Sequence, residues 1–154
     1  MSASDVINAP ITATLAGHEY KIRRVSVMRM LACAEDYIIR QHMRRVRMIG
    51  DALGEEDRLT IVREETAKLP SNKDLAAQGR ALIVDPPDEV ACDILLAALE
   101  IDHPALSRDE VALIFQEATE QETQPVMKAI VGNSSAPTQT STGRSRKRTT
   151  GRRK

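Results

Sequence analysis

Apolar residues recur with a helical period from Ser26 to Leu53, the longest such stretch in the chain. Ser26 is a favourable N-cap residue, and neither proline nor glycine follows it before Gly50. One broad side of the predicted helix gathers Met28, Leu31, Ala32, Ile38, Ile39, Met43, Val46, Ile49 and Leu53. With a rise of about 1.5 Å per residue, the helix would be roughly 40 Å long. We therefore expect one long helix that lies across the core of a small domain.

A β-hairpin is predicted upstream of this helix. Ile11 to Leu15 alternates apolar and polar residues, and His18 to Arg23 resumes the alternation after Ala16-Gly17. Alternation with a period of two is typical of strands, and glycine readily adopts the positive φ of a tight turn. Two strands alone are marginally stable in water. The hairpin must therefore pack on the long helix or pair with another chain, which leaves a homo-oligomer open.

Shorter helical patterns follow the long one. The pattern Asp88–Glu100 is apolar nearly all round, with Asp93 as its only internal charge, so it should be the most buried element. Ser107 and Glu110 form a capping box at the start of a late helix. The other predicted helices are Asp57–Leu69, with Leu59, Val62 and Leu69 inward; Lys73–Val84, interrupted at Gly79; and Val126–Val131, with Pro125 in its first turn and Gly132 at its end.

These patterns predict a mostly α fold, α+β in the loose sense, with an N-terminal β-hairpin packed on a bundle of about five helices. Residues 11–132 form this domain, residues 1–10 a flexible lead, and residues 133–154 a disordered basic tail. A hydrophobic fraction of 42% in 154 residues suits one modest core. With one Phe, two Tyr and no Trp, this core must be aliphatic.

The net charge of zero conceals an uneven distribution. From Ser134 onward the chain has seven basic residues and no acidic one, which leaves 15 basic against 22 acidic residues in the rest. Such a tail attracts any polyanion without sequence specificity, and it has no aromatic side chain to stack on bases. A merely solubilising terminus is the alternative. The candidate polyanion-binding residues are Arg144, Arg146, Lys147, Arg148, Arg152, Arg153 and Lys154.

Candidate chemistry is sparse. The histidines are far apart, and no spacing typical of a metal site, a phosphate-binding loop or a catalytic serine occurs. Cys33 and Cys92 stand alone in apolar contexts and should be reduced core thiols. The start of the chain does not resemble a signal peptide, and no stretch approaches the roughly 20 apolar residues of a membrane span. We expect a soluble cytoplasmic protein that is no enzyme and binds no cofactor or metal.

The long helix carries two candidate contact surfaces. Met30, Tyr37 and Met48 line up opposite its apolar side, where adaptable methionines suit a partner helix, although a plain scatter of surface residues explains them equally. Arg29, Arg40 and Arg47 form a narrow basic stripe, in which Asp36 can pair with Arg40.

Glu35 and His42 pose a separate question, because both lie in the middle of the apolar side. A buried charge without a partner is costly. Either these side chains are partly exposed or meet a polar neighbour from the hairpin, or they fix the register of a helical contact. The pattern leaves both explanations open.

Two segments carry a family resemblance. The hairpin Thr14 to Ile22, Thr-Leu-Ala-Gly-His-Glu-Tyr-Lys-Ile, leads through Val-Ser-Val into the long helix, and His103 to Glu110, His-Pro-Ala-Leu-Ser-Arg-Asp-Glu, opens a late helix. This order resembles the tail assembly chaperones of tailed bacteriophages and prophages, over roughly residues 11–131. The segment from Gly54 to Asp85 matches no motif of that family, and the basic tail is not a feature that the family predicts.

The resemblance implies a non-enzymatic chaperone in the host cytoplasm. Such a protein coats the tape-measure protein during virion morphogenesis, keeps it soluble and helps recruit tail-tube subunits. A programmed frameshift often extends members of the family. The alternative is a small nucleic-acid-associated protein that binds through its basic C-terminal tail.

Overall fold

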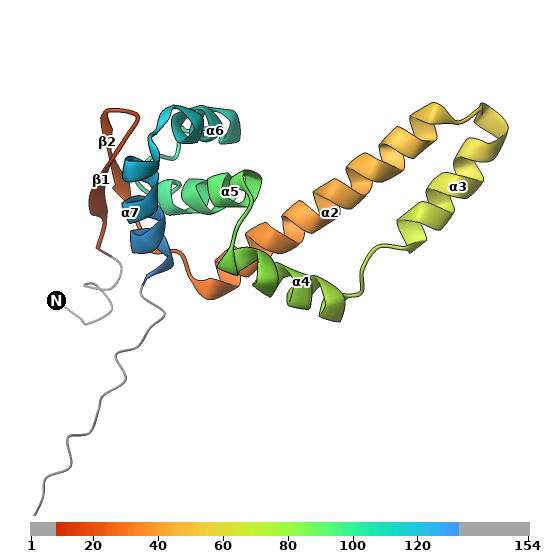
Figure 1. Ribbon diagram of the computed structural model, residues 1–154, viewed down its shortest axis with the longest axis horizontal. Coiled ribbons are helices and arrows are strands. Elements are labelled where there is room, and N and C mark those ends of the chain that lie inside the picture. Colours follow the sequence, from red (N-terminus) through yellow and green to blue (C-terminus); the bar gives the residue numbers. More distant parts are fainter. Residues whose placement is uncertain (1–8, 133–154) are drawn as a thin grey trace, which may run out of the picture.

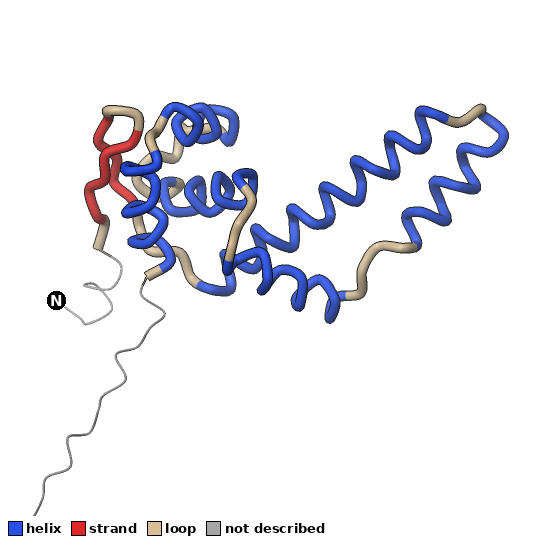
Figure 2. Tube along the Cα trace, viewed as in Figure 1, coloured by secondary structure: helices blue, strands red, loops and turns tan. Residues whose placement is uncertain are grey.

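The computed structural model describes residues 9–132, in which the chain forms one β-hairpin and six helices (Figures 1 and 2). The elements are β1 (Ile11–Leu15), β2 (His18–Ile22), α2 (Val27–Ala52), α3 (Glu55–Ala67), α4 (Asn72–Val84), α5 (Asp88–Leu99), α6 (Arg108–Glu117) and α7 (Glu120–Val131). The predicted mostly helical fold with an N-terminal hairpin is confirmed. The predictions for residues 1–8 and 133–154 lie outside the described residues. None of the described helices is long and apolar enough to span a membrane.

The hairpin follows the predicted alternation. β1 and β2 pair antiparallel, with Leu15 opposite His18 beside the turn. Ala16 and Gly17 form this turn, and their φ angles are +50° and +76°. Two successive positive φ angles match the twist of the flanking strands, which is why two-residue hairpin turns favour them. Leu15 and Ile22 are fully buried on the inner face of the hairpin.

Helices from the second half of the chain cover the hairpin. β2 packs on α5, and β1 packs on α6 and α7. Beyond β2, the Arg23 N–H donates to the Ala98 carbonyl at 2.9 Å and the Val25 N–H to the Ile130 carbonyl at 3.1 Å. The hairpin is therefore stabilised within its own chain, mainly by α5, α6 and α7 and not by the long helix.

The long helix α2 begins as predicted, and the Ser26 hydroxyl accepts a hydrogen bond from the Arg29 N–H at 3.2 Å. Its first half belongs to the core, where Met30, Cys33 and Ala34 are buried. Its second half leaves the body of the molecule, and α3 folds back along it (Figure 1). We call the second half of α2, from Met43 onward, together with α3 "the arm".

Several side chains predicted to face inward are exposed on α2 and α3. Met28 is 75% exposed, Met43 46% and Leu59 77%, and Leu69 is also exposed. These predictions are wrong. On the arm, α3 packs mainly on α2, so only one narrow side of each helix is covered, and Met43 and Leu59 stay exposed. Val62 of α3 lies on that side and is half-buried.

The helix α4 runs without a break through Gly79, so the predicted interruption is wrong. A Cβ atom at Gly79 would lie 3.4 Å from Glu35 Cγ and 3.7 Å from Ala34 Cβ, both on α2. The glycine therefore marks a close helix contact and not a helix end. Ser71 caps α4, with its hydroxyl accepting from the Asp74 N–H at 3.3 Å.

The helix α5 is the centre of the core, as predicted: nine of its twelve residues are buried. It contacts α2, α6, α7 and β2. The largest fully buried side chains of the described part are aliphatic or Met: Leu15, Ile22, Met30, Val90, Ile94, Leu95, Leu99, Val111 and Ile130. The prediction of an aliphatic core is therefore confirmed.

The last two helices differ in how well the sequence predicted them. The Ser107–Glu110 capping box of α6 is present, with the Ser107 N–H donating to Glu110 Oε2 at 2.7 Å. α7 begins earlier than predicted, through a second capping box of Thr119 and Glu122. Pro125 consequently lies inside α7 and not in its first turn. The helix start is therefore set by the Thr-x-x-Glu signature of Thr119 and Glu122 and not by the proline.

Candidate functional site

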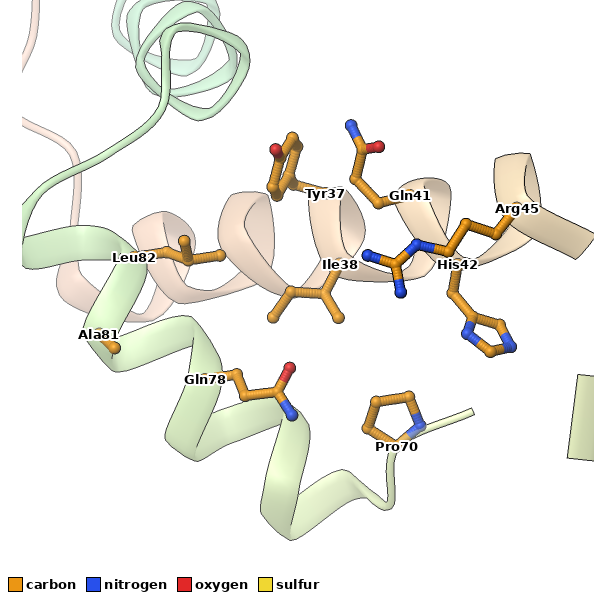
Figure 3. A pocket seen from close by; sticks show the side chains of 9 residues that line it. All are labelled: Tyr37, Ile38, Gln41, His42, Arg45, Pro70, Gln78, Ala81 and Leu82. Carbon is orange, nitrogen blue, oxygen red and sulfur yellow. The ribbon is translucent and has the colours of Figure 1, made fainter. Parts of the chain in front are cut away.

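A cleft of about 510 Å³ opens between α2 and α4, at the base of the arm (Figure 3). We call it the α2–α4 cleft. Ile38, Pro70 and Leu82 form its apolar part, and Figure 3 shows Ile38 and Leu82 between the two helices. The other lining residues are Tyr37, Gln41, His42, Arg45, Gln78 and Ala81. An apolar floor with a few polar groups at the rim is the usual composition of a binding site.

His42 connects this cleft to the arm. Its Nε2 lies 2.8 Å from the Glu65 carbonyl oxygen of α3. Because a carbonyl only accepts, Nε2 must carry the proton of this hydrogen bond. The polar neighbour of His42 thus comes from α3 and not from the hairpin, and a helical contact explains this residue. Glu35 lies two turns earlier on α2 and is half-buried against Gly79 of α4.

A second hollow, of about 260 Å³, lies on the arm itself. We call it the arm groove; Met43, Val46, Arg47, Gly50, Arg58, Leu59 and Val62 line it. A Cβ atom at Gly50 would lie only 3.0 Å from Val62 Cγ2, so this glycine lets α2 and α3 approach closely. Two helices cannot enclose a core, and Met43 and Leu59 therefore stay exposed at the groove.

The predicted seam of Met30, Tyr37 and Met48 does not form one surface. Met30 is 1% exposed and belongs to the core, so its predicted exposure is wrong. Tyr37 is half-buried and lines the α2–α4 cleft, and Met48 is 73% exposed on the arm. The three residues share a helix side, but the neighbours of α2 change from the body to the arm along its length.

The predicted basic stripe is divided in the same way. Arg29 Nη2 lies 3.3 Å from Glu100 Oε2, and Arg40 pairs with Asp93 of α5 and not with the nearby Asp36. Arg47 is exposed and lines the arm groove. Arg29 and Arg40 therefore form ion pairs within the chain, whereas Arg47 is exposed to solvent on the arm.

Asp93 is the centre of an ion network between three helices. Arg40 of α2 bonds to one of its oxygens, and Arg108 Nε of α6 donates to the other at 2.6 Å. This hydrogen bond raises the pKa of the Arg108 guanidinium. Beside it, Arg44 Nη1 lies 3.0 Å from Glu89 Oε1. The sequence singled out Asp93 as an isolated charge but gave no sign of its partners, which lie 53 and 15 positions away.

Both cysteines are free and buried, as predicted. Burial raises the pKa of the Cys33 thiol, and it raises the pKa of Cys92 to about 11. A protonated thiol is a poor nucleophile and a poor metal ligand. Among residues 9–132, no group of three or more His, Cys, Asp or Glu side chains is placed to hold a metal ion.

The comparisons with known proteins add no relative: no family model, no curated protein and no solved structure matches this chain. The seven basic residues of the tail lie outside the described residues. The site is therefore defined by two features of the described part, the α2–α4 cleft and the arm. Sequence reasoning found the arm helix but missed the cleft, because residues of the cleft such as Arg45 and Gln78 meet only when α4 folds back along α2.

Proposed function

We propose that this chain is an assembly chaperone of a phage or prophage tail, which binds the tape-measure protein and helps recruit tail-tube subunits. The observation that carries the proposal is the arm, which presents Met43, Met48 and Leu59 to solvent (46%, 73% and 77% exposed) away from the core. Exposed apolar side chains on one part of a protein favour a protein partner, and methionine adapts to many partner shapes.

The resemblance of the hairpin and of the His103–Glu110 segment to tail assembly chaperones supplies the identity of the partner. A long, aggregation-prone helical client needs a reversible apolar contact that shields its own apolar stripe. A two-helix arm offers such a contact without exposing the core that stabilises the fold. The proposed function requires no catalytic group.

The genomic neighbourhood is the first test. A long, coiled-coil-rich reading frame beside the gene for this chain is expected. That protein should stay soluble when it is co-expressed with the chain and precipitate without it. The triple variant Met43→Ser, Met48→Ser, Leu59→Ser should fold normally, because exposed substitutions usually cost under about 0.5 kcal/mol each, but it should lose this activity.

A matched control uses exposed apolar residues outside the arm. Val84 is 87% exposed, Ile101 63% and Leu113 57%. Replacing these three by Ser should leave the client soluble. If the arm variant melts like the wild type and still keeps the client soluble, the arm is not the contact.

The alternative, a nucleic-acid-associated protein, is favoured by the seven basic residues between Arg144 and Lys154. Deletion of residues 134–154 separates the two proposals. The chaperone should retain its client after the deletion. A nucleic-acid-binding protein should lose binding to duplex DNA, and the affinity of the full chain should fall steeply with added salt.

A further inference from the structure

We infer that the α2–α4 cleft binds an acidic amphipathic helix of the client, with an aliphatic side chain on the apolar floor and a carboxylate on Arg45. This inference deepens the proposed function and rests on it. It goes beyond the exposed Met and Leu side chains of the arm, because it names a second contact, at the base of the arm, and the chemistry that this contact recognises.

The floor of the cleft suits aliphatic side chains. Ile38 and Leu82 are half-buried, so each keeps apolar surface that α2 and α4 do not cover, and Pro70 is half-buried at the same cleft. A volume of about 510 Å³ lies within the range of roughly 300–1,000 Å³ that binding pockets usually have. It accepts a few side chains, as when a helix places one apolar stripe into a groove.

The charges at the cleft select an acidic partner. Arg45 is exposed, and no ion pair or hydrogen bond of its side chain occurs among the described residues. Its neighbour Arg44 is different, because Glu89 holds it at 3.0 Å. None of the nine residues that line the cleft is an Asp or Glu. An unpaired guanidinium beside an apolar floor favours a carboxylate, to which arginine binds with two parallel hydrogen bonds.

The rim adds a further polar group for recognition. Gln78 points from α4 toward the space between the two helices, whereas the Gln41 side chain of α2 points away from α4 (Figure 3). The Gln41 amide is partly engaged, since its Nε2 lies 3.4 Å from Glu89 Oε1. Gln78 has no such contact among the described residues and can bond a polar side chain of the bound helix. Such rim contacts add specificity more than affinity.

The test uses the full chain and its co-expressed client. Arg45→Glu should reduce the amount of client that co-purifies with the chain by about tenfold or more, because a like charge then faces the client carboxylate. The matched control is Arg80→Glu on α4, since Arg80 is exposed, does not line the cleft and lies outside the arm. The control should capture the client like the wild type.

The outcomes separate this inference from the proposed function. If the wild type and Arg45→Glu capture the client equally, the cleft inference is overturned and the proposed function stands. If the wild type captures no client, the proposed function is overturned. The inference about the cleft is then tested by peptide binding alone.

The peptide experiment uses two synthetic amphipathic helices, each with the same leucine stripe and one tryptophan. In one peptide the stripe is flanked by Glu residues, and in the other by Lys residues. The chain has no Trp, so indole fluorescence reports the peptide only. The Glu peptide should bind the wild type, weaken with added salt, and lose about tenfold in affinity for Arg45→Glu. The Lys peptide should prefer Arg45→Glu. Equal binding of both peptides to both proteins would overturn the inference.

Discussion

Arg108 Nε donates a hydrogen bond to Asp93 Oδ1 at 2.6 Å and so joins the start of α6 to the middle of α5. Asp93 is 9% exposed and is the one buried charged residue within residues 9–132. Arg40 bonds to its other oxygen from α2. One carboxylate thus sets the relative position of three helices, one of which continues into the arm.

Replacing Asp93 by Ala should destabilise the protein by about 1.5–3 kcal/mol, the usual worth of hydrogen bonds to charged groups. The loss of stability stays moderate because the Arg40 and Arg108 side chains are more than a third exposed, so water can solvate both guanidinium groups when Asp93 is absent. Glu89→Ala should cost less than about 1 kcal/mol, because its pairs are exposed. Urea denaturation of both variants measures the difference, and equal losses would mean that Asp93 is not the central partner.

Met30 and Met48 should differ strongly when each is replaced by Ala. Met30 is 1% exposed and Met48 73%. Met30→Ala leaves a cavity and should lower the free energy of unfolding by about 2–5 kcal/mol. Met48→Ala should change it by less than about 0.5 kcal/mol. Thermal melts of both variants check this, and a Met48 variant that melts as early as the Met30 variant would place the arm in the core.

The hairpin turn can be improved at Ala16. Its φ of +50° lies in the left-handed region, which costs a residue with a Cβ atom roughly 1–2 kcal/mol. Asn tolerates this region, and Asn-Gly is the preferred pair for such a turn. Ala16→Asn should therefore raise the stability by up to about 1 kcal/mol in a thermal melt. Gly17→Ala should lower it, and an Ala16→Asn variant less stable than the wild type would contradict the turn geometry.

The thiols should react slowly in the folded protein. Burial raises the pKa of Cys92 to about 11 and also raises that of Cys33. At pH 8 both are then protonated, and both are sterically covered. A chromogenic disulfide reagent should label two thiols per chain at once in denaturant and label the native protein only as fast as it opens. Immediate labelling of the native protein would show an accessible thiol.

Acid should destabilise the fold through three carboxylates with lowered pKa values. Arg23 lowers the pKa of Asp102 by hydrogen bonding, and the N-cap groups of Ser107 and Thr119 lower those of Glu110 and Glu122. A lowered folded-state pKa stabilises the fold above the unfolded-state pKa, and this stabilisation disappears as the pH falls through the folded-state value.

The stability should therefore be constant above about pH 5 with respect to these groups and fall below about pH 4.5, where unfolded carboxyls begin to bind protons. The variant Glu110→Gln, Glu122→Gln should be less stable at pH 7 and show a shallower loss between pH 5 and 3. Chemical denaturation at each pH measures this. Parallel pH curves of variant and wild type would contradict the assignment.

Local signals predicted the elements, whereas burial depended on distant neighbours. The turn at Ala16-Gly17 and the cap at Ser107 were predictable because their partners lie within a few residues. Met30 and Met48 lie on one side of the same helix, yet only Met30 is buried, because α5 packs on the body end of α2, whereas α3 covers a different side of the arm end and leaves Met48 exposed. No pattern along α2 could show this difference.

The candidate site was predictable only in part for the same reason. The long helix and its exposed Met48 followed from periodicity and capping. The α2–α4 cleft required Arg45 and Gln78 to meet across the intervening helix α3. The second capping box, Thr119 with Glu122, was present in the sequence and could have been found by the rule that identified the first.

The contact between the first and last described elements bears on how the chain folds as it leaves the ribosome. The Gly17 N–H donates to Glu122 Oε1 across 105 positions of sequence. At roughly 5–20 residues per second of synthesis, Glu122 emerges about 5–20 s after Gly17. During that interval the hairpin has no α7 to cover Leu15 and Ile22, whereas α2 can already pair with α3 and α4. The two helices of the arm can thus pack together before α7 is available to complete the cover of the hairpin.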